Sequence, residues 1–128
     1  MSIYTKKGDG GETGLPGKGR LPKSDLIFEV LGSLDQTNAL IGLAITLIDQ
    51  KREKELMHFL ETIQSDLLSI GSTIASEEPL SSNTLTTLDK RTLELEAHID
   101  SWDSQLPELK NFILPCGCQA AAVIHLTR

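Results

Sequence analysis

The chain is poor in cysteine and in long apolar runs, and each shortage removes a class of protein. Its two cysteines, Cys116 and Cys118, are separated by one residue. That spacing is poor geometry for a structural disulfide and supplies too few ligands for a closed zinc site. No stretch approaches the ~18 consecutive apolar residues of a membrane-spanning helix, and residues 1–7 lack the apolar run of a signal peptide. The sequence therefore predicts a cytoplasmic protein with free thiols and no membrane partner.

Positive charge is also scarce, because 12 Lys and Arg residues face 18 Asp and Glu residues and leave a net charge of −6. This balance argues against nucleic acid or an anionic membrane as the main partner. An anionic small molecule would need a local basic pocket. The length of 128 residues predicts a single domain over residues 1–128, which would bury roughly two thirds of its unfolded surface.

Apolar spacing predicts an all-α helical bundle over residues 24–128, preceded by a glycine-rich loop over residues 1–23. Ser24 is the expected N-cap of the first helix. Stripes of apolar residues at intervals of three and four predict the first three helices, over about 24–49, 51–75 and 83–103. The stripe of the first helix includes Ile41 and is completed by the polar Asn38, and the stripe of the second helix includes Leu60. A fourth helix is expected from about Gly117 to Arg128 without a stop signal, so we expect the C-terminal part of the bundle to be missing.

The segment 5–14 combines glycines with two lysines and two threonines. Triphosphate binding favours that mixture, because glycines let backbone N–H groups approach phosphate oxygens while lysines neutralise their charge. The segment matches neither the Walker pattern nor the dinucleotide fingerprint. On composition alone, a mobile N-terminal loop is the more common explanation.

Three further positions allow both a structural and a functional interpretation. Asp35 is either a solvated carboxylate or part of a crowded interface, and the helix glycines Gly32 and Gly42 beside it favour close packing or a ligand. Phe112 is either a core aromatic or a wall for a large planar ligand. Arg128 lies three residues after His125, which is also the spacing of an ordinary polar edge of a helix.

Taken together, these segments resemble the PduO-type ATP:corrinoid adenosyltransferase family. The resemblance covers essentially the whole chain, and the first and last of the matching blocks are distinctive. It rests on residues 3–14, 22–25, 32–42, 63–67 and 112–128.

The resemblance implies a fold, a reaction and a set of site residues. The family is an all-α bundle that forms a homotrimer with active sites between subunits, and it transfers the 5′-deoxyadenosyl group of ATP to the cobalt of a reduced corrinoid. Phe112 would face the corrinoid, Asp35 would pair with Arg128 across the subunit boundary, and Mg²⁺ would accompany ATP. The ATP-binding residues implied in the same way are Thr5, Lys6, Lys7, Gly8, Thr13, Gly14 and Lys23.

Two departures from the family pattern leave alternatives open. Cys116 stands where the family usually has a small residue, and the family's Arg-Arg-Ala-Glu-Arg block lies beyond Arg128. We therefore expect the 128-residue chain to be inactive and a longer form to be the working enzyme. The rival hypotheses are a degenerate protein that binds ATP or corrinoid without turnover, and a helical interaction protein.

Overall fold

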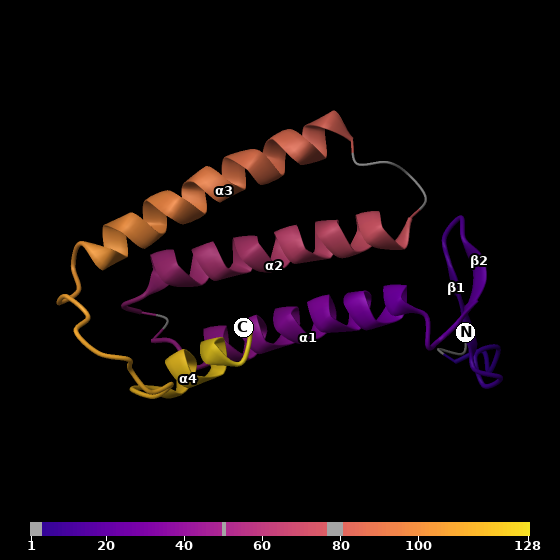
Figure 1. The fold of residues 1–128 in the computed structure, drawn as a ribbon, viewed down its shortest axis with the longest axis horizontal. Helices are drawn as coiled ribbons and strands as arrows, with labels where there is room; N and C mark the ends of the chain where they lie inside the picture. The colour runs from indigo at the N-terminus through magenta and orange to yellow at the C-terminus, as the bar shows by residue number, and fades with distance from the viewer. Residues whose placement is uncertain (1–3, 50, 77–80) are drawn as a thin grey trace. The chain divides into compact units, whose positions relative to one another are not determined.

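The computed structural model describes residues 4–49, 51–76 and 81–128. Within these residues the chain forms a two-stranded hairpin followed by four helices (Figure 1). The mainly helical fold that the sequence predicts is thereby confirmed. The elements are β1 (Glu12–Leu15), β2 (Gly19–Pro22), α1 (Leu26–Thr46), α2 (Lys54–Ala75), α3 (Ser82–Asp103) and α4 (Gln119–His125).

The hairpin lies inside the segment 1–23, which the glycine pattern predicts to be a loop. Strands β1 and β2 pair antiparallel, with Thr13 opposite Leu21 and Gly14 opposite Arg20. Pro16 and Gly17 form the turn between them, closed by a hydrogen bond of 3.2 Å from the Lys18 N–H to the Leu15 carbonyl. A proline followed by a glycine with φ of 79° is the arrangement of a type II turn, which explains why this stretch reverses direction.

The chain divides into two compact units, of which the first contains the hairpin, α1, α2 and α4. Helices α1 and α2 run antiparallel beside one another, and α4 packs against α1 (Figure 1). Ile41, Ala44 and Leu60 are buried in this unit. Ile41 and Leu60 belong to the predicted apolar stripes, whereas Ala44 lies outside them.

The N-cap of the first helix and the extent of the fourth helix differ from the prediction. The N-cap of α1 is Asp25 rather than Ser24, because the Asp25 carboxylate accepts the Ile27 N–H at 3.0 Å. Helix α4 starts after Cys118 and ends at His125, so it is shorter than the predicted helix over 117–128. The Leu126 and Thr127 amides bond to the Val123 and Ile124 carbonyls, which converts the last residues into turns.

The second compact unit contains α3 and the connector that follows it. Ser81 caps α3 by accepting the Thr84 N–H at 3.1 Å. Residues 106–115 form neither helix nor strand, as the two prolines in this connector predict. The single domain over residues 1–128 stays a prediction.

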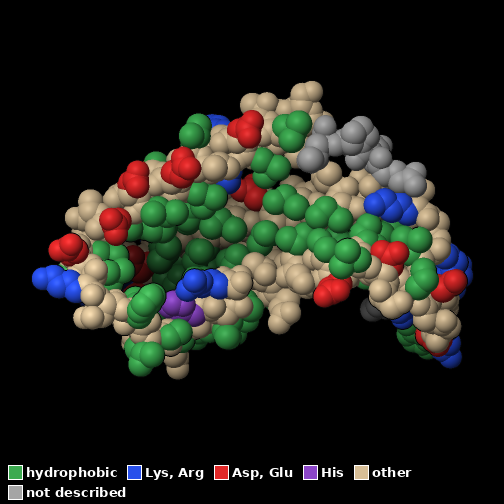
Figure 2. Space-filling view, viewed as in Figure 1, with side chains coloured by type: hydrophobic (Ala, Val, Ile, Leu, Met, Phe, Trp, Pro, Cys, Tyr) green, Lys and Arg blue, Asp and Glu red, His purple; other side chains and the backbone are tan. Residues whose placement is uncertain are grey.

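Apolar surface is abundant in this small fold. Figure 2 shows hydrophobic side chains gathered in a band over α2 on the face in view. Large apolar residues also remain exposed on α1 and α2, including Leu26 at 69% and Leu68 at 62% of their maximal surface. A monomer rarely leaves so much apolar surface in water, so these helices are suited to packing against further protein surface.

Candidate functional site

Two turns and one longer-range hydrogen bond shape the glycine-rich segment between Tyr4 and the hairpin. The Asp9 N–H donates to the Lys6 carbonyl at 3.3 Å, and the Gly11 N–H donates to the Gly8 carbonyl at 3.2 Å. The Lys23 N–H then donates to the Gly11 carbonyl at 2.8 Å and joins the end of the hairpin to the loop. The segment is therefore a folded loop with hydrogen bonds of its own.

Lys23 lies directly beside Gly8, although fifteen positions separate them in the sequence. A Cβ added to Gly8 would lie 3.3 Å from Lys23 Nζ and 3.3 Å from the Glu12 carbonyl oxygen. Any side chain at Gly8 would therefore push against the ammonium group or the backbone. The structure thus brings together a bare backbone segment and a cation, the combination that binds phosphate.

Arg20 is a residue that the sequence analysis did not select. Its Nη2 donates to the Lys7 carbonyl at 2.6 Å and to the Glu12 carbonyl at 3.2 Å, and its Nε donates to Glu12 Oε2 at 3.3 Å. The guanidinium therefore fastens β2 to the loop before β1. A hairpin prediction at Pro16 and Gly17 would have placed Arg20 opposite Gly14 and drawn attention to it.

The remaining predicted ATP-binding residues divide between the loop and β1. Lys6 has a φ of 58°, a left-handed conformation that is uncommon for a residue other than glycine. Its Nζ lies 5.7 Å from the centre of the Tyr4 ring. Thr5 and Lys7 are exposed in the same loop, whereas Thr13 and Gly14 belong to β1.

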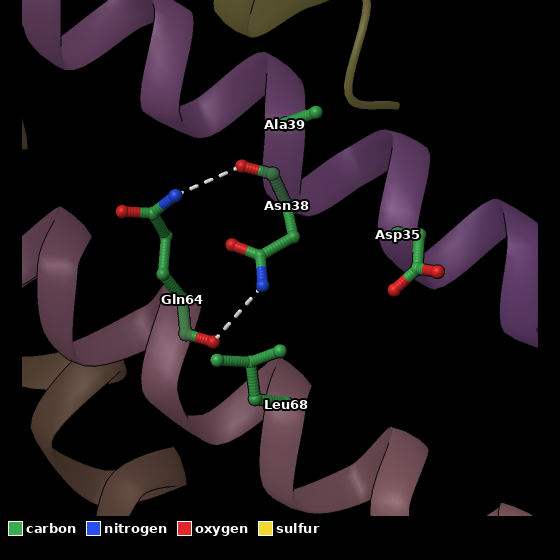
Figure 3. Close-up of a pocket in the computed structure, with 5 residues that line it drawn as sticks. All are labelled: Asp35, Asn38, Ala39, Gln64 and Leu68. Carbon is green, nitrogen blue, oxygen red and sulfur yellow. Dashed lines mark hydrogen bonds between the residues drawn. The ribbon is translucent and has the colours of Figure 1, made fainter. Parts of the chain in front are cut away.

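A second site lies between α1 and α2, where a cavity of about 400 Å³ is lined by Asp35, Asn38, Ala39, Gln64 and Leu68. Figure 3 shows the Asn38 and Gln64 side chains pointing toward one another across the two helices. Asn38 Nδ2 donates to the Gln64 carbonyl at 3.3 Å, and Gln64 Nε2 donates to the Asn38 carbonyl at 2.9 Å. Asn38 Oδ1 is buried without a hydrogen-bond partner, so it remains available to a donor.

Asn38 completes the predicted apolar stripe of the first helix, whereas the sequence pattern predicts no role for Gln64. Two amides within facing apolar stripes are the signal that could have found the pair. Of the two helix glycines, Gly42 fits the expected close packing, because an added Cβ would lie 3.1 Å from Gln64 Nε2. At Gly32 an added Cβ would meet no atom within 4 Å, so packing inside this chain does not explain that glycine.

The predicted partner residues Asp35 and Arg128 form no ion pair in the described part of this single chain. Both side chains are exposed. Phe112 lies in the second compact unit with its side chain fully exposed. Cys116 and Cys118 are exposed thiols outside any disulfide, as the sequence predicts.

The described residues contain neither a metal-binding cluster nor a membrane-spanning helix. No three His, Cys, Asp or Glu side chains among them gather closely enough to hold a metal ion. None of their helices combines the length and apolar character needed to cross a membrane.

Comparison with known proteins shows the family. The cobalamin adenosyltransferase family model matches residues 3–128, and the chain belongs to this family. The chain is 40% identical over 129 residues to the corrinoid adenosyltransferase of Bacillus subtilis, covering 100% of this chain and 65% of the relative. It is 38% identical over 132 residues to corrinoid adenosyltransferase MMAB of Homo sapiens, covering 98% of this chain and 52% of that protein. The chain thus spans between about half and two thirds of these relatives.

Solved structures show the same relationship. A variant of the PduO-type ATP:corrinoid adenosyltransferase from Lactobacillus reuteri, complexed with ATP, superimposes with a TM-score of 0.82 at 32% sequence identity. That match covers 98% of this chain and 69% of the other. A second variant, complexed with cobalamin and ATP, also has a TM-score of 0.82, at 31% identity over 98% of this chain and 68% of the other.

Proposed function

We propose that this chain binds ATP in its N-terminal loop and forms part of an ATP:corrinoid adenosyltransferase. The reaction transfers the 5′-deoxyadenosyl group of ATP to the cobalt of a reduced corrinoid and yields adenosylcobalamin and triphosphate. Family membership supports the reaction, and the relatives complexed with ATP and cobalamin support the two substrates.

The observation that carries the proposal is the contact between Lys23 and Gly8. It places a cation against a backbone that has no side chain to keep a phosphate away. Lys6 and Lys7 add two further cations in the same loop. In a chain with a net charge of −6, these lysines supply the local positive charge that an anionic ligand needs.

The reaction requires that the two substrates be positioned and that the negative charge of the leaving triphosphate be neutralised. Cobalt(I) supplies both electrons of the new cobalt–carbon bond and becomes formally cobalt(III), while the bond between C5′ and the triphosphate oxygen breaks. The leaving triphosphate keeps the electron pair of that bond. Lysines and backbone N–H groups stabilise the charge that develops on it, so the reaction needs no general acid.

Phe112 is proposed to face the corrinoid. Its fully exposed ring offers an apolar surface that a large planar ligand can cover. Against the lower face of the corrinoid, this ring would exclude a coordinating water or base from cobalt. Loss of that axial ligand makes cobalt(II) easier to reduce to the nucleophilic cobalt(I).

Mg²⁺ is proposed to accompany ATP. The loop carboxylates are Asp9 and Glu12, and Glu12 is already paired with Arg20 at 3.3 Å. This donor set fits a Mg²⁺ held mainly by phosphate oxygens and water, which is the usual arrangement for this ion. Its contribution would be to neutralise the leaving triphosphate.

We also propose a homotrimer with active sites between subunits. The exposed apolar side chains of α1 and α2 support an assembly, and so do the unpaired charges of Asp35 and Arg128. In the trimer, Asp35 of one subunit would pair with Arg128 of its neighbour. The cytoplasmic location stays a prediction.

Two measurements test the proposed function. Titration calorimetry should detect ATP binding by the 128-residue chain, and a chain extended at its C-terminus with the segment of the Bacillus subtilis relative that follows the matched region should adenosylate reduced cobalamin in an anaerobic absorbance assay. ATP binding without turnover in both forms would favour the degenerate binding protein. Absence of ATP binding in both forms would overturn the proposal.

A further inference from the structure

Lys18 occupies the turn of the hairpin and reaches a different part of the fold. Its Nζ donates a hydrogen bond of 3.1 Å to the Ile74 carbonyl, across 56 positions of sequence, in a partly buried environment. Ile74 lies in the last turn of α2, which ends at Ala75. The contact therefore joins the hairpin to the C-terminal end of this helix.

The end of α2 is suited to receive such a cation. The last four carbonyls of a helix have no partner within the helix, and the helix dipole places partial negative charge there. In α2 the Ser76 N–H satisfies the Ser72 and Thr73 carbonyls, but the Ile74 carbonyl is not among its acceptors. The last turn of α2 also contains no basic residue of its own. Lys18 thus supplies, from the hairpin, the charge that this helix end lacks.

The hairpin connects this attachment point to the glycine-rich loop. Lys18 directly precedes β2, which carries Arg20 and ends just before Lys23. Arg20 holds the Lys7 carbonyl, and Lys23 holds the Gly11 carbonyl and lies against Gly8. A continuous series of contacts therefore runs from α2 through Lys18 and β2 to the loop that we propose for ATP.

We propose that Lys18 is a positioning residue for the ATP loop: by binding the C-terminal end of α2, it holds the hairpin so that the loop backbone and Lys23 face the triphosphate together. This role rests on the proposed function. Lys18 does not itself touch ATP, and its effect is transmitted through β2.

The test compares Lys18→Met, which keeps the long apolar stem and loses the charged donor, with Lys18→Arg, which keeps a donor of similar reach. Lys51→Met serves as the control, because Lys51 is an exposed lysine before α2. Hydrogen exchange of the amides in residues 12–21 is measured without ATP. Losing a hydrogen bond from a charged donor should accelerate that exchange by about tenfold in Lys18→Met.

ATP affinity is then measured by titration calorimetry on the same proteins. Lys18→Met should weaken ATP binding by about tenfold at an almost unchanged melting temperature, whereas Lys18→Arg and Lys51→Met should stay within about twofold of the original chain. A purely structural lysine would not change affinity at constant melting temperature.

Each of the other outcomes would contradict a different part of the proposal. Unchanged exchange together with weakened ATP binding would mean that Lys18 contacts ATP directly, and faster exchange with unchanged affinity would mean that the attachment does not position the loop. Unchanged exchange and unchanged affinity would remove any role for Lys18. A failure of both the original and the extended chain to bind ATP would instead overturn the proposed function, independently of the exchange result.

Discussion

Asn38 of α1 and Gln64 of α2 each donate a side-chain hydrogen bond to the other residue's backbone carbonyl, at 3.3 and 2.9 Å. A helix carbonyl can accept a second hydrogen bond, so the pair connects two helices without disturbing either one. The pair also borders the cavity that contains Asp35. It therefore fixes how α1 and α2 face one another at the place where Asp35 is presented.

Replacing Gln64 with alanine should destabilise the chain by about 0.5–1.5 kcal/mol, because the Asn38 carbonyl loses the hydrogen bond from Gln64 Nε2, whereas Asn38 Nδ2 keeps the Gln64 backbone carbonyl as its acceptor. Urea unfolding measures the change. Gln36→Ala is the matched control on the exposed side of α1, and it should stay within about 0.5 kcal/mol of the original chain. Equal effects of the two substitutions would mean that the pair contributes nothing specific.

Gly42→Ala should behave differently from Gly32→Ala, although both replace a glycine inside α1. Alanine gains about 1 kcal/mol of helix propensity at an open position, and Gly32 is such a position. At Gly42 the new Cβ lies 3.1 Å from Gln64 Nε2 and must displace that group, so the gain should disappear. It should return when Gly42→Ala is combined with Gln64→Ala, which a double-mutant cycle by urea unfolding would detect. Additive effects would contradict the proposed steric conflict.

Ser24 and Asp25 can be compared directly as the N-cap of α1. Asp25→Ala should cost about 0.5–2 kcal/mol of stability, since it removes the acceptor of the Ile27 N–H, while Ser24→Ala should change little. Thermal or urea unfolding of the two variants decides between them. A larger loss from Ser24→Ala would restore Ser24 as the cap.

ATP affinity should depend on the loop lysines. Lys23→Ala should weaken ATP binding by about tenfold or more, because a charged contact contributes roughly 1.5–3 kcal/mol. Lys6→Ala should also weaken binding, and in an active form it should raise the apparent Michaelis constant for ATP. Lys54→Ala, an exposed lysine at the start of α2, is the control. An unchanged dissociation constant in either loop variant would remove that lysine from the site.

Charge exchange tests the proposed pair between subunits. Asp35→Arg or Arg128→Asp alone should weaken the trimer, because each places like charges at the same boundary, and combining both should restore assembly. Sedimentation equilibrium over a range of protein concentrations measures the association. If the combined variant assembles no better than the single ones, the two residues are not partners.

Much of the secondary structure could be predicted from local patterns, while the hairpin and the caps could not. Apolar residues at helical spacing are a repeated signal, so α1, α2 and α3 were found with ends shifted by a few residues. The hairpin is only four residues per strand, and its many glycines favoured a loop. Ser24 and Asp25 are adjacent and have similar N-cap preferences, so the sequence could not decide between them. The backbone conformation at the start of the helix decides which of the two is the cap.

The sequence by itself determined that this protein is mainly helical, that its only concentration of glycine and lysine is near the N-terminus, and which family it resembles. Each of these properties depends on residues close together in the chain or on the order of short motifs. Only the tertiary structure decided that Lys23 lies against Gly8, that Gln64 meets Asn38 and that Lys18 reaches Ile74. These contacts join positions 15 to 56 residues apart, where the path of the backbone through the fold decides which groups come within bonding distance.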